Sequence, residues 1–158
     1  MGKIFEDRAG WTIGMEYELN CEVSARGSFD FMTVRSETGD TVLTVSGDMG
    51  GNDWRRVEIA TAPIAIGDVT QRRDNVKIIL SLMELFGGIA GEKRPMPKSA
   101  VPQAFEQLQK GCSKKYTCSC LLDTDKLMIR TFAEFISIGT EQISFGMPIQ
   151  DVDLFLKY

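Results

Sequence analysis

The chain has 158 residues, of which 43% are hydrophobic and 25% are charged, and its formal net charge is -4. This composition is typical of one globular domain over residues 1–158, and the mildly acidic balance argues against nucleic acid or an anionic membrane as a partner. Because the sequence contains no histidine, catalytic triads, His-ligated zinc and histidine bases are excluded, and any catalysis must use carboxylates, Lys or Arg, Tyr, thiols or a metal.

The first third of the chain predicts β-structure. In residues 11–23, WTIGMEYELNCEV, every second residue from Trp11 is mostly apolar, while the alternate positions include Glu16, Glu18 and Glu22. This period of two is that of a strand with one buried and one polar face. Further strands are predicted at 28–34, 41–48 and 54–60, with turns or loops at 25–27, 36–40 and 49–53. Their regular spacing is typical of an antiparallel meander.

A helix is predicted over residues 68–87. Asp68 and Gln71 form an N-cap and N3 pair, and Gly87-Gly88 stands where a helix commonly ends. The apolar residues at helical spacing predict one buried stripe: Val69, Val76, Ile79, Leu80, Met83 and Phe86. Residues 88–98 predict a loop. A shorter helix is predicted at 100–110, with Ser99 as its cap and Pro102 in its first turn.

The last third returns to predicted strands, at 115–122, 126–138 and 141–149, and residues 150–158 resemble the start of another helix. Strands without helical crossovers, then two helices, then strands indicate an α+β fold rather than a doubly wound α/β fold. We therefore expect a twisted antiparallel sheet with two helices packed on its apolar face.

The polar faces of three predicted strands each contain an acid. Glu16 and Glu18 lie on the first strand, Asp48 on the third, and Glu58 on the fourth beside Arg56. If the apolar faces all point to the helices, these side chains converge on the opposite surface. Such a surface is either a solvated strand face or a site for a hard divalent cation with oxygen ligands.

Two segments carry a resemblance to a known group of enzymes. GMEYEL (14–19) and VEIATAPI (57–64), followed by a capped helix ending in glycine, resemble the front half of the carboxylate–amine ligase superfamily, which includes glutamate–cysteine ligase, glutamine synthetase and the bacterial amidoligases. The resemblance covers roughly residues 11–88. It implies that Glu16, Glu18 and Glu58 bind magnesium, which would hold the phosphates of ATP while a carboxylate is phosphorylated and then attacked by an amine.

The sequence departs from that pattern at one point. Amidoligases usually follow the helix with a strand of the G-x-H-x-H kind, whereas residues 111–122 read GCSKKYTCSCLL. Cys118 and Cys120 share one predicted strand face and Cys112 is near them. A metal or a reactive thiol is one interpretation of these residues, and buried or free thiols are the expected one.

Two arginines suit phosphate chemistry, because a guanidinium presents a bidentate fork of donors. Arg56 and Arg130 are predicted to neutralise phosphate charge as it develops, with Asp48 supporting the cofactor. For Arg130 the alternative is a pairing with Glu134, four residues further along the same strand.

EQISFGMPI (141–149) is similar to a segment of some C-terminal domains of bacterial polymorphic toxins, although it also fits a two-faced strand ended by Pro148. The leading hypothesis is an ATP- and Mg-dependent carboxylate–amine ligase-like domain of a bacterial effector or toxin. It would act on a small-molecule or protein carboxylate and have a cognate immunity or delivery protein. The alternative is a non-enzymatic immunity protein or adaptor whose acidic face binds a basic partner.

The N-terminus and the hydropathy pattern give two expectations about location. The charged N-terminus has no apolar signal-peptide region, and no window is long and apolar enough for a membrane helix. We expect a cytoplasmic protein, or a domain exported by a non-Sec route as part of a larger delivery protein.

Overall fold

The structure, a computed structural model, describes residues 10–24, 30–48 and 53–147. The predicted turn at 25–27, most of the loop at 49–53, the last residues of the strand at 141–149 and the segment at 150–158 lie outside the described residues. None of the helices in the described ranges is long and apolar enough to span a bilayer.

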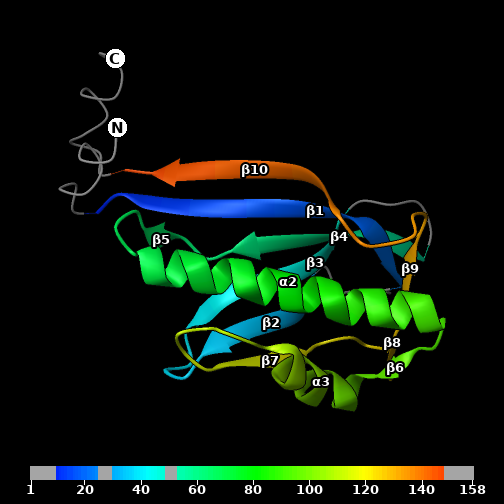
Figure 1. Cartoon of the computed structure of the whole chain (residues 1–158). Coiled ribbons are helices and arrows are strands. Elements are labelled where there is room, and N and C mark those ends of the chain that lie inside the picture. Colours follow the sequence, from blue (N-terminus) through cyan, green and yellow to red (C-terminus); the bar gives the residue numbers. More distant parts are fainter. Residues whose placement is uncertain (1–9, 25–29, 49–52, 148–158) are drawn as a thin grey trace.

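One antiparallel sheet forms the back layer of the molecule (Figure 1), and its main strands follow the spatial order β10-β1-β4-β3-β2-β7. Their bounds are β1 Thr12–Ser24, β2 Asp30–Ser36, β3 Thr41–Asp48, β4 Trp54–Thr61, β7 Tyr116–Cys120 and β10 Ile138–Gly146. Two short strands, β5 (Ile64–Ala65) and β9 (Ile129–Thr131), also pair with β1. The α+β class and the antiparallel sheet are confirmed.

The meander prediction holds for only part of the sheet. Strands β2, β3 and β4 follow one another in space, but β1 lies between β4 and β10 and does not pair with β2. Sequence spacing could not show this, because pairing partners are chosen by the packing of the whole sheet. The consequence is functional, since Glu18 of β1 comes to lie directly opposite Glu58 of β4.

The helices α2 (Val69–Glu92) and α3 (Val101–Leu108) cover one face of the sheet (Figure 1), with the 3₁₀ turn η1 (Lys98–Ala100) leading into α3. The core fills the space between these layers. The strands β6 (Met96–Pro97) and β8 (Lys126–Leu127) form a separate two-stranded pair. The apolar side of β1 is buried as predicted at Tyr17, Leu19, Cys21 and Val23.

Helix α2 differs from the prediction at its end and in its buried face. Its N-cap is Asp68 as expected, with the carboxylate accepting the Gln71 N–H at 2.9 Å. The helix runs through Gly87-Gly88 and ends at Glu92, with Lys93 as its C-cap in the left-handed conformation with φ 51°. Each glycine costs a helix about 1 kcal/mol, but burial of Ile89 beyond the pair outweighs that cost.

The predicted apolar stripe of α2 mixes two faces. Ile79 and Phe86 are buried, and Met83 is partly buried. The remaining members, Val69, Val76 and Leu80, are 47%, 49% and 57% exposed, so their prediction as core residues was wrong. The face of α2 that meets the sheet carries polar side chains in their place: Gln71, Asp74, Asn75 and Ser81.

These inward polar groups fasten the segment before β7 to α2. The Asp74 carboxylate accepts the Ser113 N–H at 2.8 Å, the Lys114 N–H at 3.2 Å and the Tyr116 hydroxyl at 2.7 Å. Burial acts to raise the pKa of Asp74, but these hydrogen bonds together lower that pKa below its ordinary value. A fully buried charge is thus compensated by donors.

The predicted strand at 126–138 is broken. Residues 126–131 contribute to β8 and β9, and β10 begins only at Ile138. Asn20 holds the intervening segment, since its backbone N–H donates to the Ser137 carbonyl at 3.0 Å and its side chain bonds Phe135 O and Ser137 N. Strand β1 therefore exchanges β10 for β9 as its neighbour in this region.

Candidate functional site

The sheet face opposite the helices presents its polar side chains in rows that run across the strands. One row reads Asp30, Ser46, Glu58, Glu18 and Thr140, from β2 to β10. The next row reads Asp48, Arg56, Glu22 and Arg130, from β3 to β9. Because cross-strand partners have neighbouring Cβ atoms, each row is a set of close side chains.

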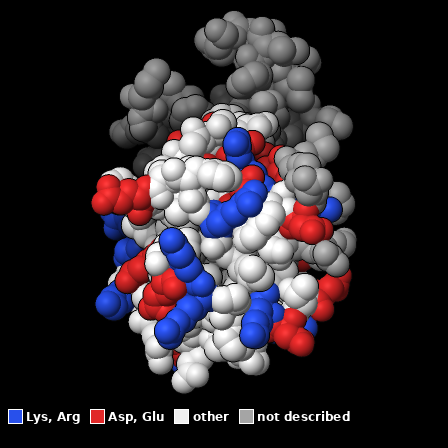
Figure 2. Space-filling view, turned by 90° about the vertical axis from the view of Figure 1, so that its right-hand side faces the viewer, with Lys and Arg blue, Asp and Glu red and all other residues white. Residues whose placement is uncertain are grey.

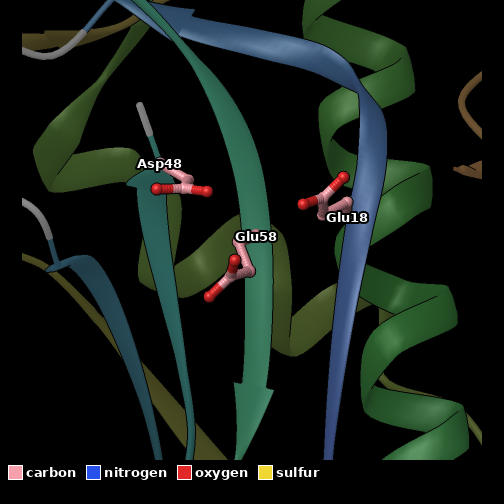
Figure 3. Close-up of side chains that lie close together, drawn as sticks. All are labelled: Glu18, Asp48 and Glu58. Atoms are coloured by element: carbon pink, nitrogen blue, oxygen red, sulfur yellow. The ribbon is translucent and has the colours of Figure 1, made fainter. Parts of the chain in front are cut away.

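Three carboxylates meet where these rows adjoin (Figure 3). Oxygen atoms of Glu18, Asp48 and Glu58 all lie within 4.8 Å of one another. Glu58, on the middle strand, has Glu18 on one side and Asp48 on the other, and all three are half-buried. Among the residues that the structure describes, this is the one group of three Asp, Glu, His or Cys side chains with such geometry.

The electrostatics of this carboxylate cluster, Glu18, Asp48 and Glu58, centre on Glu58. Partial burial raises the pKa of Glu58, and the negative charges of Asp48, Glu16 and Glu18 raise it further. The ionised form of Glu58 is therefore disfavoured by like charges when no cation is near. A divalent ion would relieve that repulsion, which is the usual electrostatic basis of a carboxylate metal site.

Glu16 lies one step outside the cluster. It follows the same face of β1, opposite Ala60 of β4 and Gln142 of β10. Its charge reaches Glu58 and contributes to the raised pKa. Of the four acids predicted to converge on this face, the structure brings Glu18, Asp48 and Glu58 within 4.8 Å of one another, and Glu16 lies beside them.

The row of alternating charge places Arg56 beside the cluster and Arg130 at the far end of the row, across Glu22. The Nη1 atom of Arg56 lies 3.6 Å from Oε2 of Glu18, and Arg56 remains largely exposed. The Nε and Nη2 atoms of Arg130 both lie 2.6 Å from Oε2 of Glu22. Glu22, rather than the predicted alternative Glu134, is the ion-pair partner of Arg130. Arg56 and Arg130 thus flank Glu22 on neighbouring strands.

Two aromatic rings lie against the guanidinium of Arg130. Its guanidinium carbon lies 4.3 Å from the ring centroid of Trp54 and 5.4 Å from that of Phe132. Such cation–π contacts hold a guanidinium in place while leaving its outer edge accessible. A hollow of about 200 Å³ lies here, lined by Asn20, Cys21, Glu22, Arg56, Phe132 and Ala133.

The surface at this end of the molecule is not dominated by one sign of charge. Figure 2 shows basic and acidic side chains interspersed around the end that carries β9. The alternating charges of the row from Asp48 to Arg130 are therefore part of a surface of mixed charge. The cluster of Glu18, Asp48 and Glu58 differs from it, because three negative side chains lie together there.

The cysteines have the character of unreactive thiols. Burial raises the pKa of Cys21 to about 12 and that of Cys118 to about 12. Burial is also the largest cause of the raised pKa at Cys112 and Cys120. Each of the four is a free thiol. A protonated, buried thiol is a weak nucleophile and a poor metal ligand, which matches the expectation of buried or free thiols.

Sequence reasoning missed part of this site. The alternation of β1 places Glu22 on the polar face without indicating a role for it, and no pattern in the sequence pairs Trp54 or Phe132 with Arg130. Asp30 belongs to the row with Glu58 and Glu18 because it lies opposite Ser46 on β3, a pairing that the sequence does not indicate. The period of two along β1 contains the signal for Glu22, whereas the aromatic contacts depend on the exchange of β10 for β9 beside β1.

Comparison with known proteins gives the fold a precedent. A search of protein-family models and a search of curated proteins each found no match. Among solved structures, the chain is similar to a Vibrio cholerae VgrG toxin ACD domain, a Glu-to-Gln mutant in complex with ADP and Mn²⁺, with a TM-score of 0.67 and 16% identity. It is also similar to a Vibrio cholerae toxin from the MARTX/VgrG family, with a TM-score of 0.66 and 17% identity.

The chain has the fold of these toxin domains. Both alignments cover 89% of this chain and 45% of the other, so the chain spans less than half the length of each solved structure. At this level of identity the likeness concerns the fold.

Proposed function

We propose that the polar face of the sheet binds a divalent metal and ATP, and that the chain is the nucleotide-binding part of a carboxylate–amine ligase-like toxin domain. The observation that carries this proposal is the cluster of Glu18, Asp48 and Glu58, whose oxygens lie within 4.8 Å of one another on three adjacent strands. The solved neighbour with ADP and Mn²⁺ has the same fold and supports a nucleotide and a metal in this class of domain.

The residues present fit a hard divalent cation. Mg²⁺ binds oxygen ligands at about 2.0–2.1 Å and Ca²⁺ at about 2.3–2.6 Å, so two ligands on opposite sides of an ion lie about 4–5 Å apart. The carboxylate spacing in the cluster is of this size. Mg²⁺ usually takes only one or two carboxylates together with water and phosphate oxygens. Three carboxylates and a nearby Glu16 are therefore sufficient donors.

Each residue then has a role that its position supports. Glu18, Glu58 and Asp48 would hold the cation, with Glu16 adding negative charge to the same face. Bound at this place, a divalent metal neutralises phosphate charge and polarises the transferred phosphoryl group. Arg56, which is exposed and adjacent to Glu18, is placed to meet phosphate oxygens beside the cluster.

We expect the guanidinium of Arg130 to bind phosphate from a fixed position, because Glu22 and two aromatic rings hold it in place. A guanidinium held in this way has little conformational entropy left to lose when it meets an anion. The hollow beside it provides space next to Arg56. We assign the phosphate-binding side of the site to Arg56 and Arg130.

The toxin context sets the expected partners. The solved neighbours are toxin proteins, and this chain covers 45% of the length of each. We propose that the acceptor is a small-molecule or protein carboxylate, and that the domain belongs to a longer delivery polypeptide with a cognate immunity protein. The missing His-bearing strand of the amidoligase pattern makes carboxylates and arginines the groups on which this chemistry must rest.

The test is thermal unfolding with a non-hydrolysable ATP analogue and Mg²⁺, each alone and together. A ligand present at about 100 times its dissociation constant stabilises the folded state by about 2.7 kcal/mol. For a chain of this length that corresponds to a rise in Tm of about 5–10 °C. We expect this rise with both ligands, and its loss in the double variant Glu18→Gln/Glu58→Gln.

The control is Glu37→Gln, which removes the same charge from an exposed position in the turn after β2. The control should keep the full shift. No shift in the wild-type chain, or an equal shift in the double variant, would contradict the proposal. Either result would favour the alternative of a non-enzymatic binding protein whose acidic face meets a basic partner.

A further inference from the structure

Helix α2 has a second apolar face, directed away from the sheet. Val69, Val76 and Leu80 are about half exposed on this side. In Figure 1 the outward side of α2 faces the viewer, and no described element lies in front of it. A helix that is apolar on both its inner and its outer face usually has a partner on each side.

The outward residues have the spacing of a helix-pairing seam. Their positions alternate steps of four and three: 69, 73, 76, 80, 83, 87 and 90. This is the 3.5-residue repeat with which two helices keep the same stripe in contact. The residues there are Val69, Arg73, Val76, Leu80, Met83, Gly87 and Ala90. Val69, Val76 and Leu80 are about half exposed, whereas Met83 and Ala90 are partly buried, also pack against the core and form the edge of the seam. At Gly87 an added methyl group would meet no atom within 4 Å, so the seam is open at that point.

Charge is distributed unequally along α2. Among its charged residues that are not buried, the N-terminal half carries Arg72, Arg73 and Lys77, and the C-terminal half carries Glu84 and Glu92, while Asp74 is buried on the inner side. Lys77 and Glu84 are seven residues apart and therefore lie on the same flank of the seam. Lys77 donates one hydrogen bond to the Gly111 carbonyl, which leaves other donors of its ammonium group for a second acceptor.

We propose that the outward face of α2 binds a second copy of this chain, with the two α2 helices antiparallel about a twofold axis near Leu80 and Met83. In that arrangement Leu80 packs on Met83 of the other copy, and Val76 fills the space over its Gly87. Lys77 then faces Glu84 of the other copy, and the twofold axis repeats each contact. A parallel arrangement would place like charges opposite each other, which selects the antiparallel one.

The charge pattern also selects this occupant over an unrelated helix. An isologous interface must be complementary to itself, so its basic and acidic groups must exchange places under the twofold axis. The half-and-half distribution of charge on α2 meets this requirement. The seam lies on the helix side of the molecule and is independent of the nucleotide chemistry on the opposite face of the sheet.

The experiment is sedimentation equilibrium of the full chain at low ionic strength, over concentrations from about 1 μM to 1 mM. We expect a reversible monomer–dimer equilibrium. Leu80→Glu should leave only monomer. Leu121→Glu, at a leucine of similar exposure (51%) directly after β7, should leave the dimer intact. Circular dichroism establishes that each variant is folded.

A charge exchange gives the sharper test. Lys77→Glu sets two acids against each other across the seam, because the new carboxylate faces Glu84 of the other copy. This variant should weaken the dimer by at least about tenfold, and Lys77→Glu/Glu84→Lys should restore it. A wild-type chain that stays monomeric at about 1 mM would overturn the proposal. So would a dimer that survives Leu80→Glu, or one that Leu121→Glu abolishes, because either result places the contact elsewhere.

Discussion

Replacing Glu58 with glutamine should make the metal-free protein more stable and the ligand-bound protein less stable than the wild type. Glu58 lies between Glu18 and Asp48 with their oxygens within 4.8 Å. Burial and three neighbouring acids raise its pKa, so its ionised form is disfavoured in the folded state. Glutamine keeps the size of the side chain and removes the charge.

The expected sizes follow from the arrangement. Like charges directly across a sheet destabilise it by about 0.2–1 kcal/mol per pair, so removing the charge of Glu58 should gain about 1 kcal/mol. For about 150 residues that is a rise in Tm of about 2–4 °C in the presence of a chelator. With Mg²⁺ and the ATP analogue, the wild type gains about 2.7 kcal/mol at 100 times the dissociation constant, and the variant should gain much less.

The pH dependence gives an independent check of the sign. Because the pKa of Glu58 is higher in the folded than in the unfolded chain, its proton stabilises the folded state at low pH, and this contribution is lost as the pH rises through the raised pKa. The stability advantage of Glu58→Gln in chelator should therefore be largest near pH 7 and shrink as the pH falls toward the ordinary carboxyl range.

Differential scanning fluorimetry of wild type, Glu58→Gln and Glu37→Gln, with chelator and with both ligands, measures these values. A Glu58→Gln protein that is less stable than wild type in chelator would refute the repulsion within the cluster. Equal gains of both proteins from the ligands would refute the metal site. The metal site would also be refuted if Glu37→Gln, like Glu58→Gln, were more stable than wild type in chelator and less stable with both ligands, since Glu37 lies away from the polar face.

The remaining predictions concern the fold and the arginine row. Asp74→Ala should lower the free energy of unfolding by about 3 kcal/mol, as measured by urea titration. The reason is that the Ser113 and Lys114 N–H groups and the Tyr116 hydroxyl lose their shared acceptor. A loss below about 1 kcal/mol would show that the buried carboxylate is dispensable. Since hydrogen bonds hold the pKa of Asp74 below its ordinary value, its contribution to stability should be present at neutral pH and lost as the pH falls through that lowered pKa. Arg130→Lys keeps the charge but loses the bidentate fork and the ring contacts. We therefore expect the free energy of unfolding to fall by about 1 kcal/mol and the rise in Tm with the ATP analogue to become smaller. An unchanged rise in Tm with the analogue would argue against a phosphate role for Arg130.

Much of the acidic face could be predicted because a strand has a period of two. In β1 the alternation that buries Tyr17 and Leu19 necessarily sends Glu16, Glu18 and Glu22 to the other side, whatever the neighbouring strands are. Which acids become close neighbours depends on register: the pairing of β1 with β4 sets Glu18 opposite Glu58, and the pairing of β3 with β4 brings Asp48 to them.

Helix α2 shows why the same reasoning fails elsewhere. Its outward side carries Val76 and Leu80, while its inward side carries Asp74 and Asn75. Apolar periodicity alone cannot tell which of two stripes meets the sheet when polar residues on the inner side are satisfied by hydrogen bonds. The continuation of α2 through Gly87 likewise depends on burial of Ile89 beyond it, which is a tertiary contact.

The metal site on the polar face of the sheet is tested most directly by locating a bound ion. Crystals of the chain grown with MnCl₂ and ADP should give an anomalous difference peak bounded by Glu18, Asp48 and Glu58, with the phosphates toward Arg56. Mn²⁺ is suitable because its preferred oxygen ligands match those of Mg²⁺. An anomalous peak at another part of the surface, or nucleotide bound away from the polar face of the sheet, would contradict the account.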